Sequence, residues 1–146
     1  MCIICTKKNI EGVKKLDCSN CPVLKVIPNI PGLEILICMY CPSLTTISNI
    51  AGLKVLYCSY CPSLTFIPNI AGLKHLSCAS LSITDIPAIV GLEKLYCYRC
   101  QSLTTIPNII GLEELDCSDC ILLTDIPNAN FQKVSGCPWL SQNQLC

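Results

Sequence analysis

Cysteine is the residue type with the greatest chemical potential in this chain. The sequence has 15 cysteines among 146 residues, and most of them form pairs with the spacing Cys-x-x-Cys. Cys18 and Cys21 make one pair, and Cys38 and Cys41 make the next, with sixteen residues between the two pairs. Two such pairs at this separation are the ligand pattern of a four-thiolate zinc site. Zinc binding or redox chemistry is therefore one hypothesis for this protein.

The same cysteines also fit a structural role. The pairs recur without breaking into groups of four, and Leu81 and Leu140 replace the second cysteine in two of them. Leucine cannot ligate a metal, and a buried thiolate without a metal would be costly, whereas a thiol packs as a small apolar group. We therefore predict reduced, free thiols in the core, with no metal and no cofactor. Disulfide bonds between stacked cysteines are an alternative that the sequence does not exclude, because neighbouring strands are close enough for a bridge.

Other groups give little support for catalysis. His75 is the single histidine of the chain, and a Cys–His nucleophile would need a thiol on the same surface. The acidic residues Glu113, Glu114, Asp116 and Asp119 are predicted to form a solvated face rather than a cation site. The recurrent glycines are predicted to be corners of a repeat rather than a phosphate-binding loop. We expect a protein that is not an enzyme.

The net charge and the absence of a recognisable targeting signal limit which partners and which cellular location we expect for this protein. Ten basic and ten acidic residues give a formal net charge of zero, which does not favour nucleic acid or a membrane surface as partner. The first residues lack the order of a signal peptide, and no apolar run approaches the length of a membrane helix. Together with the odd cysteine count, these features predict an intracellular, cytoplasmic protein.

A repeat of twenty residues organises almost the whole chain. Residues 33–52 read LEILICMYCPSLTTISNIAG, and residues 53–72 read LKVLYCSYCPSLTFIPNIAG. We number positions from the first residue of each unit and define repeats one to six as residues 13–32, 33–52, 53–72, 73–91, 92–111 and 112–131. Position four is leucine, position six is cysteine, position nine is cysteine or leucine, and glycine ends each of the first five units. Such self-similarity predicts a stack of identical units.

The pattern within each unit predicts its secondary structure. Positions four and six are apolar and alternate with positions expected to be exposed, as in a strand with one buried face. Beyond position nine, buried residues recur every three positions, as at Leu44, Ile47 and Ile50, and proline at Pro28 or Pro68 excludes a helix. Each unit should therefore contain one short strand, a turn and an extended or 3₁₀ return segment.

These elements predict one solenoid domain over residues 1–146. Its parallel β-sheet should line the concave face, and the return segments the convex face. Residues 1–12 are expected to form an N-terminal cap or partial repeat, residues 13–131 six repeats, and residues 132–146 a degenerate C-terminal repeat or cap.

The repeat resembles the leucine-rich repeat family. The matching pattern is LxxLxCxxC, as at Leu53, Leu56, Cys58 and Cys61, where the family has LxxLxLxxN or LxxLxLxxC. Cysteine at position six is a departure from the family pattern. The resemblance implies a right-handed coil and a polar ladder at position nine. The phrase CPSLTxIPNIxG also looks like the cysteine-rich repeats of giant viruses of amoebae, which would place the protein in the host cytoplasm.

Positions three, five, seven and eight should point outward from the sheet, where solenoids commonly bind partners. All five tyrosines and the only arginine, histidine and tryptophan occupy these positions, and Tyr, Trp and Arg dominate binding hot spots. The same frame places Val134 outward in a seventh unit, and Ser59 and Ala79 outward at position seven. The candidate binding residues are Ile35, Ile37, Met39, Tyr40, Val55, Tyr57, Tyr60, His75, Tyr96, Tyr98, Arg99 and Trp139.

The leading hypothesis is a protein-interaction module that binds a protein or peptide on this face. The first alternative is an architectural solenoid that dimerises or stacks end to end, since the apolar opening MCIIC and an uncovered end strand invite pairing.

Overall fold

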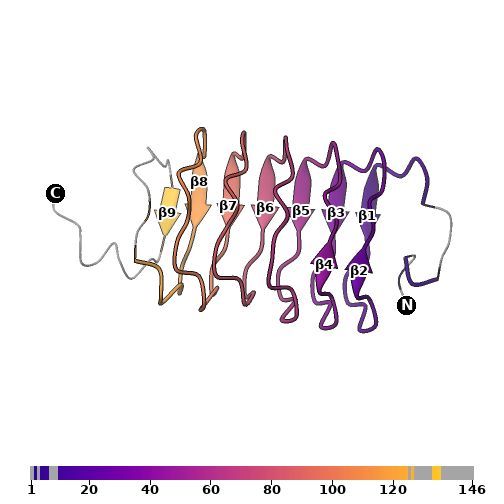
Figure 1. The fold of residues 1–146 in the computed structure, drawn as a ribbon, viewed down its shortest axis with the longest axis horizontal. Coiled ribbons are helices and arrows are strands. Elements are labelled where there is room, and N and C mark those ends of the chain that lie inside the picture. The colour runs from indigo at the N-terminus through magenta and orange to yellow at the C-terminus, as the bar shows by residue number, and fades with distance from the viewer. Residues whose placement is uncertain (1, 3, 7–9, 125, 127–132, 136–146) are drawn as a thin grey trace.

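The computed structural model describes residues 2, 4–6, 10–124, 126 and 133–135, the last three as backbone. Figure 1 shows a β-solenoid in which successive coils of the chain lie side by side. Seven parallel strands form the main sheet in the order β1-β3-β5-β6-β7-β8-β9. Their bounds are Lys15–Asp17, Ile35–Ile37, Val55–Tyr57, His75–Ser77, Lys94–Tyr96, Glu114–Asp116 and Lys133–Ser135. The predicted repeat solenoid is confirmed, with one strand of the main sheet from each repeat.

The register of the sheet follows the sequence repeat. Leu36 of β3 pairs with Leu56 of β5, and Leu56 pairs with Leu76 of β6, so position four always lies opposite position four. The register survives the shorter fourth repeat, because Leu76 still pairs with Leu95. The residue missing between positions nine and twelve is therefore absorbed in the turn, away from the sheet.

The return segment of each repeat is extended. In repeats one and two it contains the short parallel strands β2 (Val26–Ile27) and β4 (Thr46–Ile47), which pair with each other. Further along, Asp85 and Thr105 form an isolated parallel bridge. Within the described residues no helix has the length and apolar character needed to cross a membrane.

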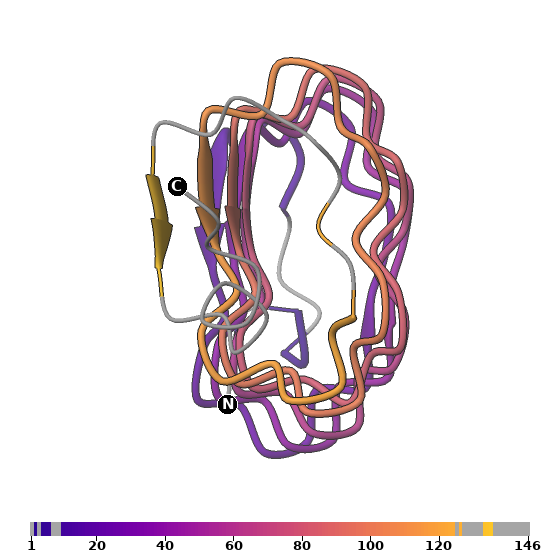
Figure 2. The same cartoon turned by 90° about the vertical axis from the view of Figure 1, so that its left-hand side faces the viewer.

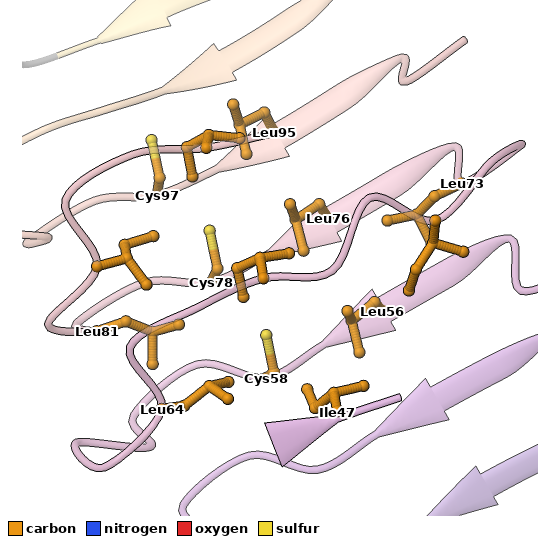
Figure 3. Packing of buried hydrophobic residues seen from close by; sticks show 14 of the residues in the cluster. Ile47, Leu56, Cys58, Leu64, Leu73, Leu76, Cys78, Leu81, Leu95 and Cys97 are labelled. Carbon is orange, nitrogen blue, oxygen red and sulfur yellow. The ribbon is translucent and has the colours of Figure 1, made fainter. Parts of the chain in front are cut away.

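The core lies between the sheet and the return segments. Figure 2 looks along the stack and shows the coils superimposed around an elongated outline, with the main sheet along one long side. Leucines at position four and cysteines at position six project inward from the sheet, and Leu64 meets them from the return path (Figure 3). Leu56, Cys58 and Leu64 have no solvent exposure. The predicted three-residue spacing of the return path is confirmed by the burial of Leu44, Ile47 and Ile50.

The glycine corner needs a left-handed backbone. Gly52 has φ of 88°, and the Leu53 N–H donates to the Ile50 carbonyl across the turn at 3.2 Å. Glycine reaches this conformation without steric cost, which explains its recurrence at the end of repeats one to five.

Ion pairs join the edges of neighbouring repeats at position two. Glu34 lies between Lys14 and Lys54, at 2.9 and 2.8 Å, and Glu93 lies 2.8 Å from Lys74. Hydrogen bonds from Lys54 and Lys14 lower the pKa of the Glu34 carboxyl to about 2. These pairs are largely exposed, so they add little stability individually but favour the observed order of repeats.

Candidate protein-binding surface

We call the outward side of the main sheet, formed by positions three, five, seven and eight of the repeats, the sheet face. The register aligns its residues in rows, so that Ile35, Val55 and His75 are neighbours at position three. Ile37, Tyr57, Ser77 and Tyr96 are neighbours at position five. Both rows are half-buried, as is Met39. The structure therefore brings together the predicted apolar residues of repeats two and three.

Three tyrosines of the sheet face contact one another, and we call Tyr40, Tyr60 and Tyr98 the tyrosine cluster. The rings of Tyr40 and Tyr60 stack with centroids 4.7 Å apart and planes inclined by 4°. The rings of Tyr60 and Tyr98 meet edge to face at 6.4 Å, and their hydroxyl oxygens are 3.0 Å apart. Such aromatic pairs add about 0.5–1.5 kcal/mol each beyond their area burial. The cluster is thus an ordered aromatic surface.

The contact between Tyr60 and Tyr98 spans an entire repeat. Tyr60 belongs to repeat three and Tyr98 to repeat five, and repeat four contributes only Ala79 and Ser80 at the equivalent positions. These small side chains leave room for the two hydroxyls to meet. The hydrogen bond to Tyr60, with partial burial, raises the pKa of Tyr98 to about 12. The Tyr98 hydroxyl consequently stays protonated at neutral pH.

Position eight has a left-handed backbone in each of the six repeats. The φ values are 56° at Asn20, 56° at Tyr40, 61° at Tyr60, 54° at Ser80, 59° at Arg99 and 58° at Asp119. Residues other than glycine pay about 1–2 kcal/mol in this region, and Asn and Asp tolerate it best. Asn20 and Asp119 suit this backbone, whereas Tyr40, Tyr60 and Arg99 do not. Sequence reasoning missed this strain, although asparagine and aspartate at the two ends of the series were a signal for it.

The C-terminal part of the sheet face is charged. The Tyr96 hydroxyl donates to one carboxylate oxygen of Glu114, and Lys94 lies 2.9 Å from the other. The hydrogen bond to Glu114, followed by burial, raises the pKa of Tyr96. Arg99 is exposed and lies 3.3 Å from Asp119. Two of the predicted acidic residues, Glu114 and Asp119, therefore pair with the neighbouring repeat, whereas Asp116 accepts a hydrogen bond from the Ser118 N–H of its own repeat at 3.0 Å.

Two outward predictions at position seven are wrong. Ser59 and Ala79 are buried, with exposures of 1% and 0%. The Ser59 hydroxyl contacts the Ser77 hydroxyl at 2.9 Å and accepts a hydrogen bond from the Ala79 N–H at 3.0 Å. This network and the turn at position eight bury the residue at position seven in repeats three and four, where its side chain is small. Ser59 therefore supports the sheet face instead of presenting a binding group.

The seventh unit also differs from its predicted frame. Val134 of β9 pairs with Leu115, which is position four, so it is shifted by one residue from the predicted outward position three. Spacing from Cys137 alone could not fix this register, because the repeat pattern is lost there. Trp139, predicted as part of the sheet face, lies outside the described residues.

The buried cysteines form a ladder of weak hydrogen bonds. The position-nine thiols of Cys41, Cys61, Cys100 and Cys120 donate to the position-six carbonyl of the preceding repeat in the stack at 3.1–3.3 Å. The predicted ladder at position nine is confirmed. At position six, the Cys18 thiol donates to the Ile37 carbonyl at 3.5 Å. Cys18 and Cys41 therefore each bond to backbone, and the four-thiolate pattern read from the sequence does not form.

Burial keeps most of these thiols unreactive. It raises the pKa of Cys61 to about 11 and that of Cys38 and Cys58 well above the ordinary value. Twelve of the described cysteines are free. Cys117 is the exception, because its sulfur is disulfide-bonded, so the prediction that all the cysteines are free is wrong at this position.

The N-terminal end contains a different arrangement of thiols. Cys21 lacks a preceding repeat and instead lies 3.5 Å from the Cys5 sulfur. Burial disfavours the Cys21 thiolate, but hydrogen bonds from the Cys2 backbone and from the Cys2 and Cys5 thiols outweigh it and lower the pKa of Cys21 to about 7. Burial and the same contacts raise the pKa of Cys5 to about 12.

A second apolar surface was not evident from the sequence pattern. Val90 and Ile110 precede the closing glycines of repeats four and five and are 85% and 86% exposed. With Ala88, Ile89 and Asn108 they line a hollow of about 110 Å³. Small or rigid residues, Pro31, Ala51 and Ala71, occupy the same position in the earlier repeats, and that contrast was the available signal.

No protein-family model matches this chain, and comparisons with curated proteins and with solved structures gave no significant match.

Proposed function

We propose that this protein is a non-enzymatic interaction module that binds a protein or peptide on the sheet face, with the tyrosine cluster at the centre of the contact. The observation that carries the proposal is the placement of Tyr40 and Tyr60 at left-handed positions. Asparagine would satisfy that backbone with less strain, and strain retained at a surface suggests a role for the side chain. Tyrosine supplies a large apolar area with a polar tip, which suits a binding hot spot.

The composition of the surface around the cluster defines the partner. Ile35, Ile37, Met39, Val55 and Tyr57 lie on the sheet face in the same repeats as Tyr40 and Tyr60 and are half-buried, so a partner would cover them with apolar side chains. Lys94, Glu114, Arg99 and Asp119 lie at the other end and are already paired in the free protein. The partner is thus expected to bring an apolar anchor to repeats two and three and polar groups toward repeats five and six.

The architecture supports two further proposals. A twenty-residue period, one inward leucine per strand and a ladder at position nine support a divergent leucine-rich repeat solenoid. We also propose that its repeats are related to the cysteine-rich repeats of giant viruses of amoebae. Twelve of the thirteen described cysteines are free and Cys117 is disulfide-bonded, a balance that favours a reducing compartment, so we propose a cytoplasmic location. This location can be tested by alkylating free thiols inside cells and mapping the modified cysteines by mass spectrometry. Oxidised ladder cysteines would contradict a cytoplasmic location.

Peptide selection provides the test of binding. Peptides selected from a random library on the wild-type protein should lose at least about 30-fold in affinity when Tyr40 and Tyr60 are replaced by asparagine, the equivalent of about 2 kcal/mol at a hot spot. The matched control is Val90→Ser with Ile110→Ser, which removes exposed apolar area elsewhere. Equal binding by wild type and by Tyr40→Asn with Tyr60→Asn would refute the proposal.

The first alternative is an architectural protein that self-associates, and measuring the oligomeric state of the same samples distinguishes it from a binding module. Sedimentation over a range of concentrations should find a monomer in both variants and the wild type. A dimer or polymer that disappears in Val90→Ser with Ile110→Ser would instead favour an architectural role.

A further inference from the structure

Three thiols converge at the N-terminal end of the solenoid. The sulfur atoms of Cys2, Cys5 and Cys21 all lie within 4.8 Å of one another. The Cys2 thiol donates to the Cys5 sulfur at 3.6 Å, and the Cys5 and Cys21 sulfurs are 3.5 Å apart. All three cysteines are free. We call them the thiol triad.

The spacing of the triad suits a coordinated metal ion. Sulfur ligands held tetrahedrally at about 2.3 Å from Zn²⁺ lie about 3.8 Å from one another. The two hydrogen-bonded separations in the triad differ from that value by only a few tenths of an ångström. A disulfide would need the sulfurs at about 2.05 Å. The triad can therefore accept an ion with small side-chain adjustments.

The thiol ladder does not account for this arrangement. Cys41, Cys61, Cys100 and Cys120 each donate to a carbonyl of the preceding repeat, whereas Cys21 has no preceding repeat. Its neighbours come from a separate turn outside the repeat frame, in which the Thr6 N–H donates to the Cys2 carbonyl at 3.1 Å. That turn presents both sulfurs of a Cys-x-x-Cys pair to Cys21. Among the residues that the structure describes, no other group of Cys, His, Asp and Glu has this geometry.

We propose that Cys2, Cys5 and Cys21 bind one thiophilic metal ion, with Zn²⁺ as the reference ion, and that this ion fastens the N-terminal turn onto the first repeat. Thiolates are soft ligands that select Zn²⁺ and Cu⁺ over harder cations. Binding releases the thiol protons to solvent and changes no oxidation state. Cys2 and Cys5 are half-buried, so water can occupy a fourth coordination position.

The site has a structural consequence for the end of the core. Cys2, Ile4 and Cys5 pack against the buried residues at the edge of the stack. This turn covers part of the end of the core beside the first coil, and an ion that links the turn to Cys21 would hold this cover in place. Metal binding to residues brought together only by folding contributes directly to stability. This role is independent of the sheet face and goes beyond the proposed binding function.

The test uses the full chain, prepared reduced and metal-free, and titrated with Zn²⁺ against a chromophoric chelator. One Zn²⁺ per chain is expected for the wild type. Cys2→Ser and Cys5→Ser, examined separately, should each weaken binding by more than about 100-fold, beyond the about 10–100-fold effect of an outer partner. The matched control is Cys61→Ser, a ladder cysteine in repeat three, and it should bind with wild-type affinity.

A second measurement needs no variant. Zn²⁺ should protect Cys2, Cys5 and Cys21 of the wild type from alkylation, as mapped by mass spectrometry, and should raise the melting temperature up to one equivalent. Absence of saturable binding would overturn the proposal. So would one ion for every two repeats, unchanged affinity in Cys5→Ser, or protection confined to ladder cysteines.

Discussion

The left-handed backbone at Tyr40 can be tested by comparing two substitutions, Tyr40→Asn and Tyr40→Ala. Both remove the ring that stacks on Tyr60 with a centroid distance of 4.7 Å, so both lose the same aromatic contact. They differ in how well the new residue accepts φ of 56°. The difference in stability between the two variants therefore reports the steric cost of the left-handed backbone, separately from the loss of packing.

The expected difference follows from the steric cost of this conformation. A residue with an ordinary Cβ pays about 1–2 kcal/mol in the left-handed region, and asparagine pays less because its short polar side chain bonds locally. We expect Tyr40→Asn to have a free energy of unfolding about 1 kcal/mol higher than Tyr40→Ala. For a domain of this size that corresponds to about 2–4 °C in melting temperature.

Thermal and urea unfolding followed by far-ultraviolet circular dichroism measure the difference. Asn20→Ala, at the equivalent position of repeat one, should lose a comparable amount relative to wild type. The control is Met39, the preceding residue, whose φ is not positive. There, Met39→Asn should be no more stable than Met39→Ala. If Tyr40→Ala equals or exceeds Tyr40→Asn in stability, position eight does not carry the strain that supports the proposed function.

Two further predictions concern the scaffold. Cys61→Ala should destabilise the protein by about 1–2 kcal/mol, because it removes a buried thiol that donates to the Cys38 carbonyl at 3.1 Å; a urea midpoint equal to that of wild type would show that the ladder contributes nothing. Glu34→Gln should lower the melting temperature at pH 7 and at low salt, where Glu34 pairs with Lys14 and Lys54. Because the pKa of Glu34 is depressed to about 2 in the folded protein, its stabilisation is present above the ordinary carboxyl range and is lost as pH falls toward 2. A difference between variant and wild type that stays constant from pH 7 to pH 2 would contradict this.

The repeat in the sequence was sufficient to predict the unit, the strand and the register. Leucine at position four and cysteine at position six must face inward, because stacking identical units places each of them beside its own copy. Even the shorter fourth repeat could be aligned, since Leu76 and Leu95 keep their place on either side of the missing residue. The frame failed at Val134, where the repeated residues are no longer present to define it.

The candidate site was predictable as a list of residues but not as an arrangement. The sequence alone placed every tyrosine on one face. Alternation along the short strand turns Tyr57 and Tyr96 outward, and Tyr40, Tyr60 and Tyr98 lie just after a strand. Only the tertiary structure decided that Tyr60 reaches Tyr98 across repeat four, that Ser59 turns inward, and that position eight is left-handed. These outcomes depend on the distance between coils and on the volume of the residue in the intervening repeat, which no period encodes. The triad of Cys2, Cys5 and Cys21 depends on tertiary structure in the same way, because it forms where a turn outside the repeat meets the first coil of the stack.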